Sequence, residues 1–335
     1  MKLAVFSAKA YDRTYFDHVC TQYPALHIDY HAFALSEETV PLAHDCDAVC
    51  VFVNDTLDEP VLRALHANGV RAILLRCAGF NHVHLPTAES LGLFAVAEFA
   101  VALVQTLNRK THRAYNRVRE GNFNIEGLLG STLHGKTVGI IGVGRIGLAT
   151  ARIFHGFGCR LLAHDPFAGE EFRRFGTLVD LDTLLRESEI VSLHCPLTEG
   201  TRHLINARTL EIIRPGAMLV NTSRGGLIDS QAIIHALKTQ RLGGVALDVY
   251  EAESDLFYDD HSGEIIHDDV LMRLMTFPNV LVCGHQGFFT REALTEIATV
   301  TLGNLDDFAN SRSCRNSLVS QGHVFVQKDT APVRL

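Results

Sequence analysis

Three side chains with complementary chemistry follow three separate apolar runs in the second half of the sequence: Arg224, Glu253 and His285. An arginine guanidinium is a planar fork that suits a carboxylate, and a histidine can donate a proton near neutral pH. A carboxylate beside that histidine stabilises its imidazolium form. Together these groups suit a reaction in which a carboxylate is held and a proton is donated to a reacting oxygen.

Each of these residues also has a purely structural interpretation when it is taken alone. Arg224 suits a surface ion pair, His285 a hydrogen-bonded core position, and Glu253 the solvated acidic stretch around it. Their shared position after expected strands favours catalysis, because the carboxyl ends of parallel strands face the ligand crevice of an α/β sheet.

The most specific motif is an expected strand that runs into G-x-G-x-x-G. The three glycines permit, in order, a tight turn, the approach of a pyrophosphate and close helix packing, and the N–H groups of the following helix start face the anion. A carboxylate ends the next expected strand, 18 residues after Gly147, where it would bind ribose hydroxyls and repel the extra phosphate of NADP. The motif therefore predicts NAD, bound by Gly142, Gly144, Arg145, Ile146, Gly147 and Asp165.

Short runs rich in Val, Ile and Leu alternate with helical patterns along the 335 residues. Such strands indicate parallel sheets covered on both faces, and the length suggests two domains. The expected strands are Lys2–Ser7, Ala48–Asn54, Ala72–Cys77, Thr137–Ile141, Arg160–His164, Ile190–His194, Ala217–Asn221, Gly244–Val249 and Val280–Cys283. The expected helices are Glu59–Asn68, Ile146–Phe157, Ser230–Gln240 and one long helix, Ala95–Arg119.

Composition argues against several other classes of protein. The formal net charge is −8 and no basic block occurs, so neither nucleic acid nor an anionic membrane is an expected partner. The most apolar long stretch, Phe94 to Leu107, contains Glu98 and falls short of the roughly 20 residues of a membrane span. No secretory signal is evident, and the eight cysteines have no framework spacing. We expect a cytoplasmic protein with reduced thiols and no metal site.

Four further stretches complete a resemblance over nearly the whole chain. The sequence resembles the D-2-hydroxyacid dehydrogenase family, and within it the bacterial fermentative D-lactate dehydrogenases. Besides the segments around Arg224, Glu253 and His285, the resemblance is carried by Val51–Asp55, Leu75–Asn81, Leu107–Arg113 and Ser192–Pro196.

The resemblance implies a site and an assembly. It implies two Rossmann-like doubly wound α/β domains, with the active site in the cleft between them. A discontinuous substrate domain would comprise residues 1–94 and 289–335, and an NAD-binding domain residues 95–288; a homodimer would form through the cofactor domain and the long helix. Backbone N–H groups near Ala78 and Gly79 would help Arg224 bind the substrate. Cofactor contacts would come from Cys195, Pro196 and Thr201 on the adenosine side and from Thr222, Ser223 and Asp248 on the nicotinamide side.

The sequence departs from the family in three places. Leu91–Phe94 passes directly into the helix at Ala95, where the family has a further strand and a V-P-x-Y-S-P-like crossover. Either the crossing between the domains is rerouted, or a deletion impairs folding or closure. Phe99 stands where the family has histidine, and His84 where it has aspartate; both changes are expected to be structural.

The expected activity is the NAD-dependent reduction of pyruvate, or of a close 2-oxo acid, to the D-hydroxy acid. A larger substrate such as phenylpyruvate or 2-oxoisocaproate stays open, with pocket size set by Phe52, Phe288 and Phe289. Two non-enzymes also stay open: an NADH-binding sensor, which has no need of the three catalytic side chains together, and an inactive paralogue, suggested by the missing crossover.

Overall fold

The computed structural model describes residues 1–76, 89–253, 256–313, 316, 319–320 and 323–324. The chain divides into two compact units. One contains Met1–Gly92 and Phe289–Val333, and the other contains Leu93–Phe288 with Arg334–Leu335. The boundary at Gly92 falls inside helix α3 (Glu89–Arg109), so the expected domain limits at 94 and 288 remain predictions.

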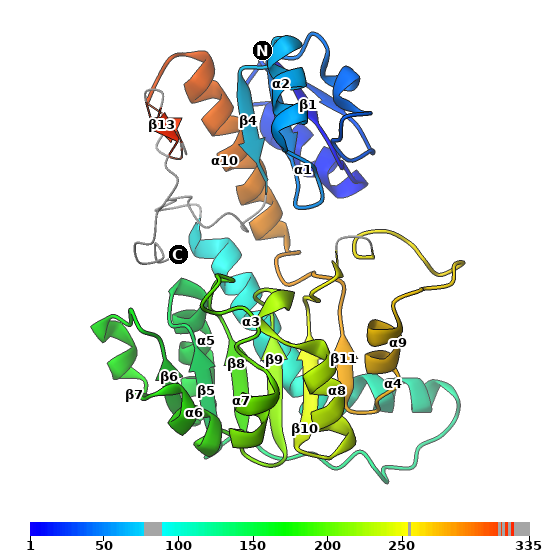
Figure 1. Cartoon of the computed structure of the whole chain (residues 1–335), viewed down its shortest axis with the longest axis vertical. Helices are drawn as coiled ribbons and strands as arrows, with labels where there is room; N and C mark the ends of the chain where they lie inside the picture. Colours follow the sequence, from blue (N-terminus) through cyan, green and yellow to red (C-terminus); the bar gives the residue numbers. More distant parts are fainter. Residues whose placement is uncertain (77–88, 254–255, 314–315, 317–318, 321–322, 325–335) are drawn as a thin grey trace. The chain divides into compact units, whose positions relative to one another are not determined.

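The first unit is built on a parallel four-stranded sheet of order β2-β1-β3-β4; β1 and β4 are labelled in Figure 1. Its strands are β1 (Lys2–Val5), β2 (His27–Tyr30), β3 (Ala48–Val51) and β4 (Ala72–Leu75). Its helices are α1 (Ala10–Cys20), the 3₁₀ turn η1 (Val40–Ala43), α2 (Glu59–Ala67) and α10 (Arg291–Ala309), and a short antiparallel pair joins β12 (Val319–Ser320) and β13 (His323–Val324).

Alternating side chains of this sheet enter two cores, because successive residues of a strand point to opposite faces. Leu3 and Val5 pack with Phe16 of α1 and with Leu302 of α10. Ala4, on the other face, packs in the second core, which also contains Leu35, Val61 and Leu65. The last long helix of the chain therefore completes the core that the first strand begins.

The second unit contains a parallel seven-stranded sheet of order β11-β10-β9-β8-β5-β6-β7. The strands are β5 (Thr137–Ile141), β6 (Arg160–His164), β7 (Thr177–Leu178), β8 (Ile190–Leu193), β9 (Ala217–Asn221), β10 (Leu242–Leu247) and β11 (Val280–Val282). The chain moves outward from β5 to β7 and then restarts at β8 on the other side of β5. This reversal creates a topological switch point between β5 and β8, where α/β proteins bind their ligands.

Helices cover both faces of this sheet. The core on one face contains residues of α3 and α5 (Arg145–Gly156). The core on the other contains residues of α6 (Leu181–Glu187), α7 (Ala207–Ile212), α8 (Ser230–Lys238) and α9 (Asp269–Met275). The two remaining turns are η2 (Glu170–Arg174) and η3 (Gly225–Leu227). Parallel strands buried on both faces explain the near-continuous apolar runs of the sequence.

The expectation of one long helix over Ala95–Arg119 was wrong. Helix α3 starts earlier, at Glu89, and α4 (Thr111–Arg119) is a separate helix. Lys110 between them has a left-handed backbone with φ 52°, which no continuous right-handed helix contains. Its ammonium group donates to the carbonyl oxygens of Gly127 and Leu129, at 3.0 and 3.1 Å, so it ties the helix break to the segment that follows α4.

Candidate active site

The glycine-rich turn lies at the switch point. Gly142 follows β5 with φ 90°, and a Cβ there would lie 2.7 Å from the backbone nitrogen of Cys195, which follows β8. A Cβ on Gly147 would collide with the carbonyl oxygen of Gly142. Both glycines are thus required for close backbone approach, as expected of a dinucleotide-binding turn.

Helix α5 starts directly from this turn and can receive an anion. Its N-cap residue is Gly144, and no side chain caps the helix. Uncapped N–H groups at a helix start, together with the helix dipole, form a binding site for phosphate. The turn therefore fits the pyrophosphate of NAD.

Asp165 lies next to the turn, directly after β6. Its carboxylate accepts hydrogen bonds from the backbone N–H groups of Val143 at 3.0 Å and Phe167 at 2.7 Å. These bonds fix the carboxylate against the glycine-rich turn, which is the position expected for a group that binds ribose hydroxyls.

The segment after β8, which contains the residues expected to bind adenosine, is hydrogen-bonded to the segment after β9. Thr201 donates its hydroxyl hydrogen to the carbonyl oxygen of Pro196 at 2.6 Å. Ser223 donates to the carbonyl oxygen of Cys195 at 2.7 Å. The buried hydroxyl oxygen of Thr222 has no hydrogen-bond partner among the described residues. Because a buried unsatisfied hydroxyl is costly, this orphaned group fits a contact to a bound cofactor.

The buried carboxylate of Asp248 organises the turn that contains His285. It accepts hydrogen bonds from the N–H groups of Gln286 and Gly287, each at 2.8 Å, and its own carbonyl oxygen accepts one from the N–H of His285. Burial raises the pKa of Asp248, against the lowering effect of those two N–H donors. His285 has a left-handed backbone with φ 53°, so its orientation is imposed by this turn.

Glu253 and His285 form a direct pair. Nδ1 of His285 lies 2.9 Å from Oε1 of Glu253, and Oε2 of Glu253 accepts a hydrogen bond from the N–H of Tyr250 at 2.8 Å. Both side chains are about one-fifth exposed. The carboxylate fixes one ring nitrogen and leaves Nε2 as the nitrogen that can serve a substrate.

Arg224 follows β9, which lies next to β10 in the seven-stranded sheet. The side-chain amide of Asn221 donates to the carbonyl oxygen of Arg224 at 2.8 Å, which shapes the turn. A Cβ on Gly225 would overlap the backbone of Tyr250, so the turns after β9 and β10 are in close contact. The guanidinium donates to the carbonyl oxygen of Ser223, and no described contact joins it to His285.

Two of the expected site residues, Ala78 and Gly79, lie outside the described residues. Phe99 lies beside the catalytic turn, since a Cβ on Gly287 would be 3.4 Å from its ring. His194, for which no catalytic or binding role was expected, is partly buried; its backbone lies next to Gly142, and its Nε2 lies 2.8 Å from the hydroxyl of Ser192. Burial lowers the pKa of His194 to about 4.

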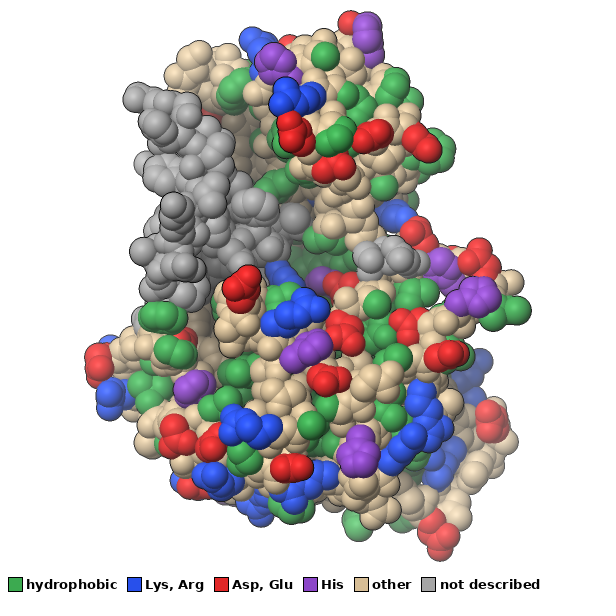
Figure 2. Space-filling view, in the orientation of Figure 1, with side chains coloured by type: hydrophobic (Ala, Val, Ile, Leu, Met, Phe, Trp, Pro, Cys, Tyr) green, Lys and Arg blue, Asp and Glu red, His purple; other side chains and the backbone are tan. Residues whose placement is uncertain are grey.

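Metal-binding clusters and membrane-spanning helices were looked for in the described part of the chain only. There, no cluster of His, Cys, Asp and Glu has the geometry of a metal site. The helices described are too short or too polar to cross a membrane. On the face seen in Figure 2, acidic and basic side chains are interspersed.

Comparison with known proteins gives consistent results. Residues 101–287 match the family model "D-isomer specific 2-hydroxyacid dehydrogenase, NAD binding domain". The 2-hydroxyacid dehydrogenase A of Aspergillus oryzae is 69% identical over 347 aligned positions that cover all of both chains. This chain has 335 residues, so some of those positions have no counterpart in it.

Solved structures agree with this match. The apo-structure of Escherichia coli D-lactate dehydrogenase is 47% identical, with a TM-score of 0.84, and the match covers 95% of this chain and 100% of that one. The D-lactate dehydrogenase of Lactobacillus jensenii, solved with NAD⁺, is 30% identical, with a TM-score of 0.78, over 96% of this chain and 100% of the other.

Proposed function

Because the chain belongs to the family of D-isomer specific, NAD-dependent 2-hydroxyacid dehydrogenases, we propose that it reduces pyruvate, or a close 2-oxo acid, to the D-hydroxy acid. The observation that best supports this activity is the 2.9 Å pair of His285 and Glu253. The pair supplies an oriented proton donor on the same sheet as the NAD-binding turn.

Each residue has a defined task in this proposal. The turn from Gly142 to Gly147 and Asp165 hold the cofactor, which supplies the hydride when it is bound. Arg224 binds the substrate carboxylate through its planar fork and polarises the ketone. These interactions orient the substrate for transfer to one face of its carbonyl carbon.

His285 and Glu253 handle the proton. Nε2 of His285 donates a proton to the alkoxide oxygen as the carbonyl is reduced. Glu253, bound to Nδ1, stabilises the positive charge of the imidazolium before that transfer and keeps the ring oriented. In the reverse reaction, the neutral imidazole accepts the proton of the hydroxyl group.

The backbone N–H groups that would bind the substrate are proposed from the resemblance alone. Backbone N–H groups of Ala78 and Gly79 would add to the carboxylate site. The size of the preferred acid would depend on Phe52, Phe288 and Phe289.

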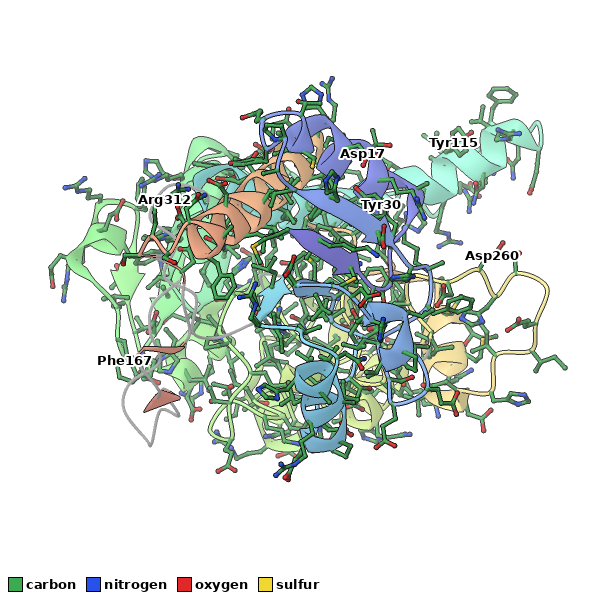
Figure 3. All side chains as sticks on the ribbon, turned by 90° about the horizontal axis from the view of Figure 1, so that it is seen from above. Asp17, Tyr30, Tyr115, Phe167, Asp260 and Arg312 are labelled. Carbon is green, nitrogen blue, oxygen red and sulfur yellow. The ribbon has the colours of Figure 1, made fainter. Side chains whose placement is uncertain are left out.

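We also propose a homodimer. Helix α4 has no buried residue, and the chain there and just beyond it exposes large apolar side chains. Figure 3 labels one of them, Tyr115, on α4. We call this set the arm surface: Tyr115, Val118, Phe123, Ile125 and Leu129. Exposed apolar patches of this kind mark protein interfaces.

The test is NADH oxidation by the purified protein with pyruvate, followed by analysis of product chirality. Rapid formation of D-lactate supports the proposal and shows that the shortened crossover is tolerated. Faster turnover of phenylpyruvate or 2-oxoisocaproate would show that the protein prefers the larger 2-oxo acids. Tight NADH binding without turnover of any of these acids would instead favour a sensor or an inactive paralogue.

A further inference from the structure

Tyr258 lies against the imidazole of His285. The two ring centroids are 5.8 Å apart, with 34° between the ring planes. The tyrosine hydroxyl also donates to the carbonyl oxygen of His285, at a long 3.5 Å. Tyr258 belongs to the segment between β10 and α9; Asp260, labelled in Figure 3, lies two residues further along it.

The backbone conformation of both residues indicates that the surrounding structure fixes the contact between Tyr258 and His285. Tyr258 has φ 76° and His285 has φ 53°. Such values cost bulky residues about 1 kcal/mol or more, and they persist where the surroundings fix them. Next to Tyr258, Phe257 is buried in the core, and its N–H donates to the carbonyl oxygen of Glu253 at 2.9 Å. The residue that pairs with His285 thus also anchors the segment that carries Tyr258.

We propose that Tyr258 is a positioning residue whose ring holds the His285 imidazole so that Nδ1 meets Glu253 and Nε2 remains for the substrate. This inference rests on the function proposed above. One hydrogen bond leaves an imidazole free to rock, because its terminal torsion is broad. A ring packed against it restricts that motion, and a misplacement of about 1 Å at a reacting group can cost about 100-fold in rate.

The ring, and not the hydroxyl, is the important part. A separation of 3.5 Å is at the limit for an O–H···O hydrogen bond, whose usual length is about 2.7–2.8 Å. Tyr258→Phe should therefore keep the wild-type rate within about twofold, whereas Tyr258→Ala should lower it by about 10- to 100-fold. Tyr258→Leu, which retains bulk but no planar ring, should lie between them.

The kinetic test measures single-turnover hydride transfer from NADH to pyruvate and the dissociation constant of NADH. Tyr258→Ala should lower kcat and leave the KM for pyruvate and the NADH affinity within about twofold, because only the proton donor is misplaced. Ile265→Ala, an exposed residue of the same segment, is the matched control and should behave as the wild type. Unchanged transfer in Tyr258→Ala, or an equal loss in Tyr258→Phe, would overturn the proposal.

A second readout does not depend on turnover. In ¹⁵N-labelled protein, the side-chain signals of His285 can be identified by their loss in His285→Gln. When the ring is neutral, they should report one tautomer in the wild type and in Tyr258→Phe and become averaged in Tyr258→Ala, with Tyr258→Leu between them. Signals unchanged by loss of the ring would contradict the positioning role even if the enzyme used a different substrate. Ordered signals without turnover in the wild type would contradict only the proposed function.

Discussion

Glu253 follows β10 and His285 follows the adjacent strand β11. Their pairing fixes which ring nitrogen of His285 faces away from the carboxylate. His285→Gln keeps a side chain of similar size but removes the proton donor. We expect the rate of pyruvate reduction to fall about 100-fold or more, with NADH binding within about twofold of the wild type. Steady-state kinetics and NADH fluorescence titration measure both, and substantial turnover in the variant would refute the assignment of the acid.

Arg224 is expected to act through the shape of its guanidinium as well as its charge. Arg224→Lys preserves the charge but offers only a single ammonium, which cannot form two parallel bonds to a carboxylate. We expect kcat/KM for pyruvate to drop about 100-fold, mostly through transition-state binding. Arg202→Lys, at a position outside the proposed substrate site, serves as the control. Equal efficiency in Arg224→Lys and wild type would remove Arg224 from the substrate site.

His194 should make stability depend on pH. Because burial lowers its pKa from 6.5 to about 4, the unfolded chain binds a proton there between these values and the native protein does not. The contribution of the neutral His194 imidazole to the free energy of unfolding is therefore complete above pH 6.5. It is lost as the pH falls towards 4, with a total on the order of 3 kcal/mol. Urea unfolding at pH 7.5 and 5 should show a smaller decrease in His194→Gln than in the wild type. Identical decreases would show that His194 is not buried in its neutral form.

Residue-level prediction from the sequence is strongest where the signal is local. The spacing of Gly142, Gly144 and Gly147 predicts a dinucleotide-binding turn, and the structure shows the close backbone approach that requires glycine at Gly142 and Gly147. Tyr258 and His194 were not found, since their importance depends on contacts with side chains distant in the sequence. Glu253 was proposed from its position after an expected strand together with the resemblance, because the acidic residues around it also suit a solvated surface.

Among the elements, α1 and β4 are joined by a buried ion pair. Nη1 of Arg76, directly after β4, lies 3.4 Å from Oδ1 of Asp12 on α1, and both side chains are almost fully buried. Arg76 also donates to the carbonyl oxygens of Phe6 and Ser7, each at 2.8 Å, and its guanidinium lies 4.5 Å from the centre of the Phe52 ring. The pair thus organises the carboxyl end of the first sheet, directly before the expected substrate segment.

Removal of one partner should be costly because it leaves a buried charge unpaired. We expect Asp12→Ala to lower the free energy of unfolding by about 3–5 kcal/mol, measured by urea denaturation. Asp17→Ala, on the same helix, removes only an exposed hydrogen bond with Tyr30 and should cost about 1 kcal/mol or less. Asp12→Leu combined with Arg76→Met should recover most of the loss. Equal costs for Asp12→Ala and Asp17→Ala would contradict this account.

Sequence periodicity predicted the buried strands to within three residues at each end, because apolar runs directly reflect burial on both faces. It did not predict β2, whose residues His27–Tyr30 alternate polar and apolar side chains at the sheet edge. The break at Lys110 was also missed, since lysine is an ordinary helix former and the left-handed backbone is stabilised by distant carbonyl groups.

On the scale of the whole molecule, the arm surface should control assembly. Phe123 and Ile125 are 75% and 80% exposed, so changing both to Asp should not harm the fold of one chain. We expect the wild type to be a dimer by light scattering and the double variant to be a monomer. Phe33→Asp, at an exposed residue of the first unit, should remain dimeric. A monomeric wild type would exclude the arm surface as a stable interface.

The return of α10 to the first core has a consequence for synthesis of the chain. Leu3 and Val5 leave the ribosome before the second unit is made, yet their core partner Leu302 leaves after it. The seven-stranded sheet lies between these residues in the sequence, and all of its strands have been synthesised once β11 has been made. We therefore expect the middle of the nascent chain to become protease-resistant first, while the N-terminal segment awaits the final helix and is the part most dependent on chaperones.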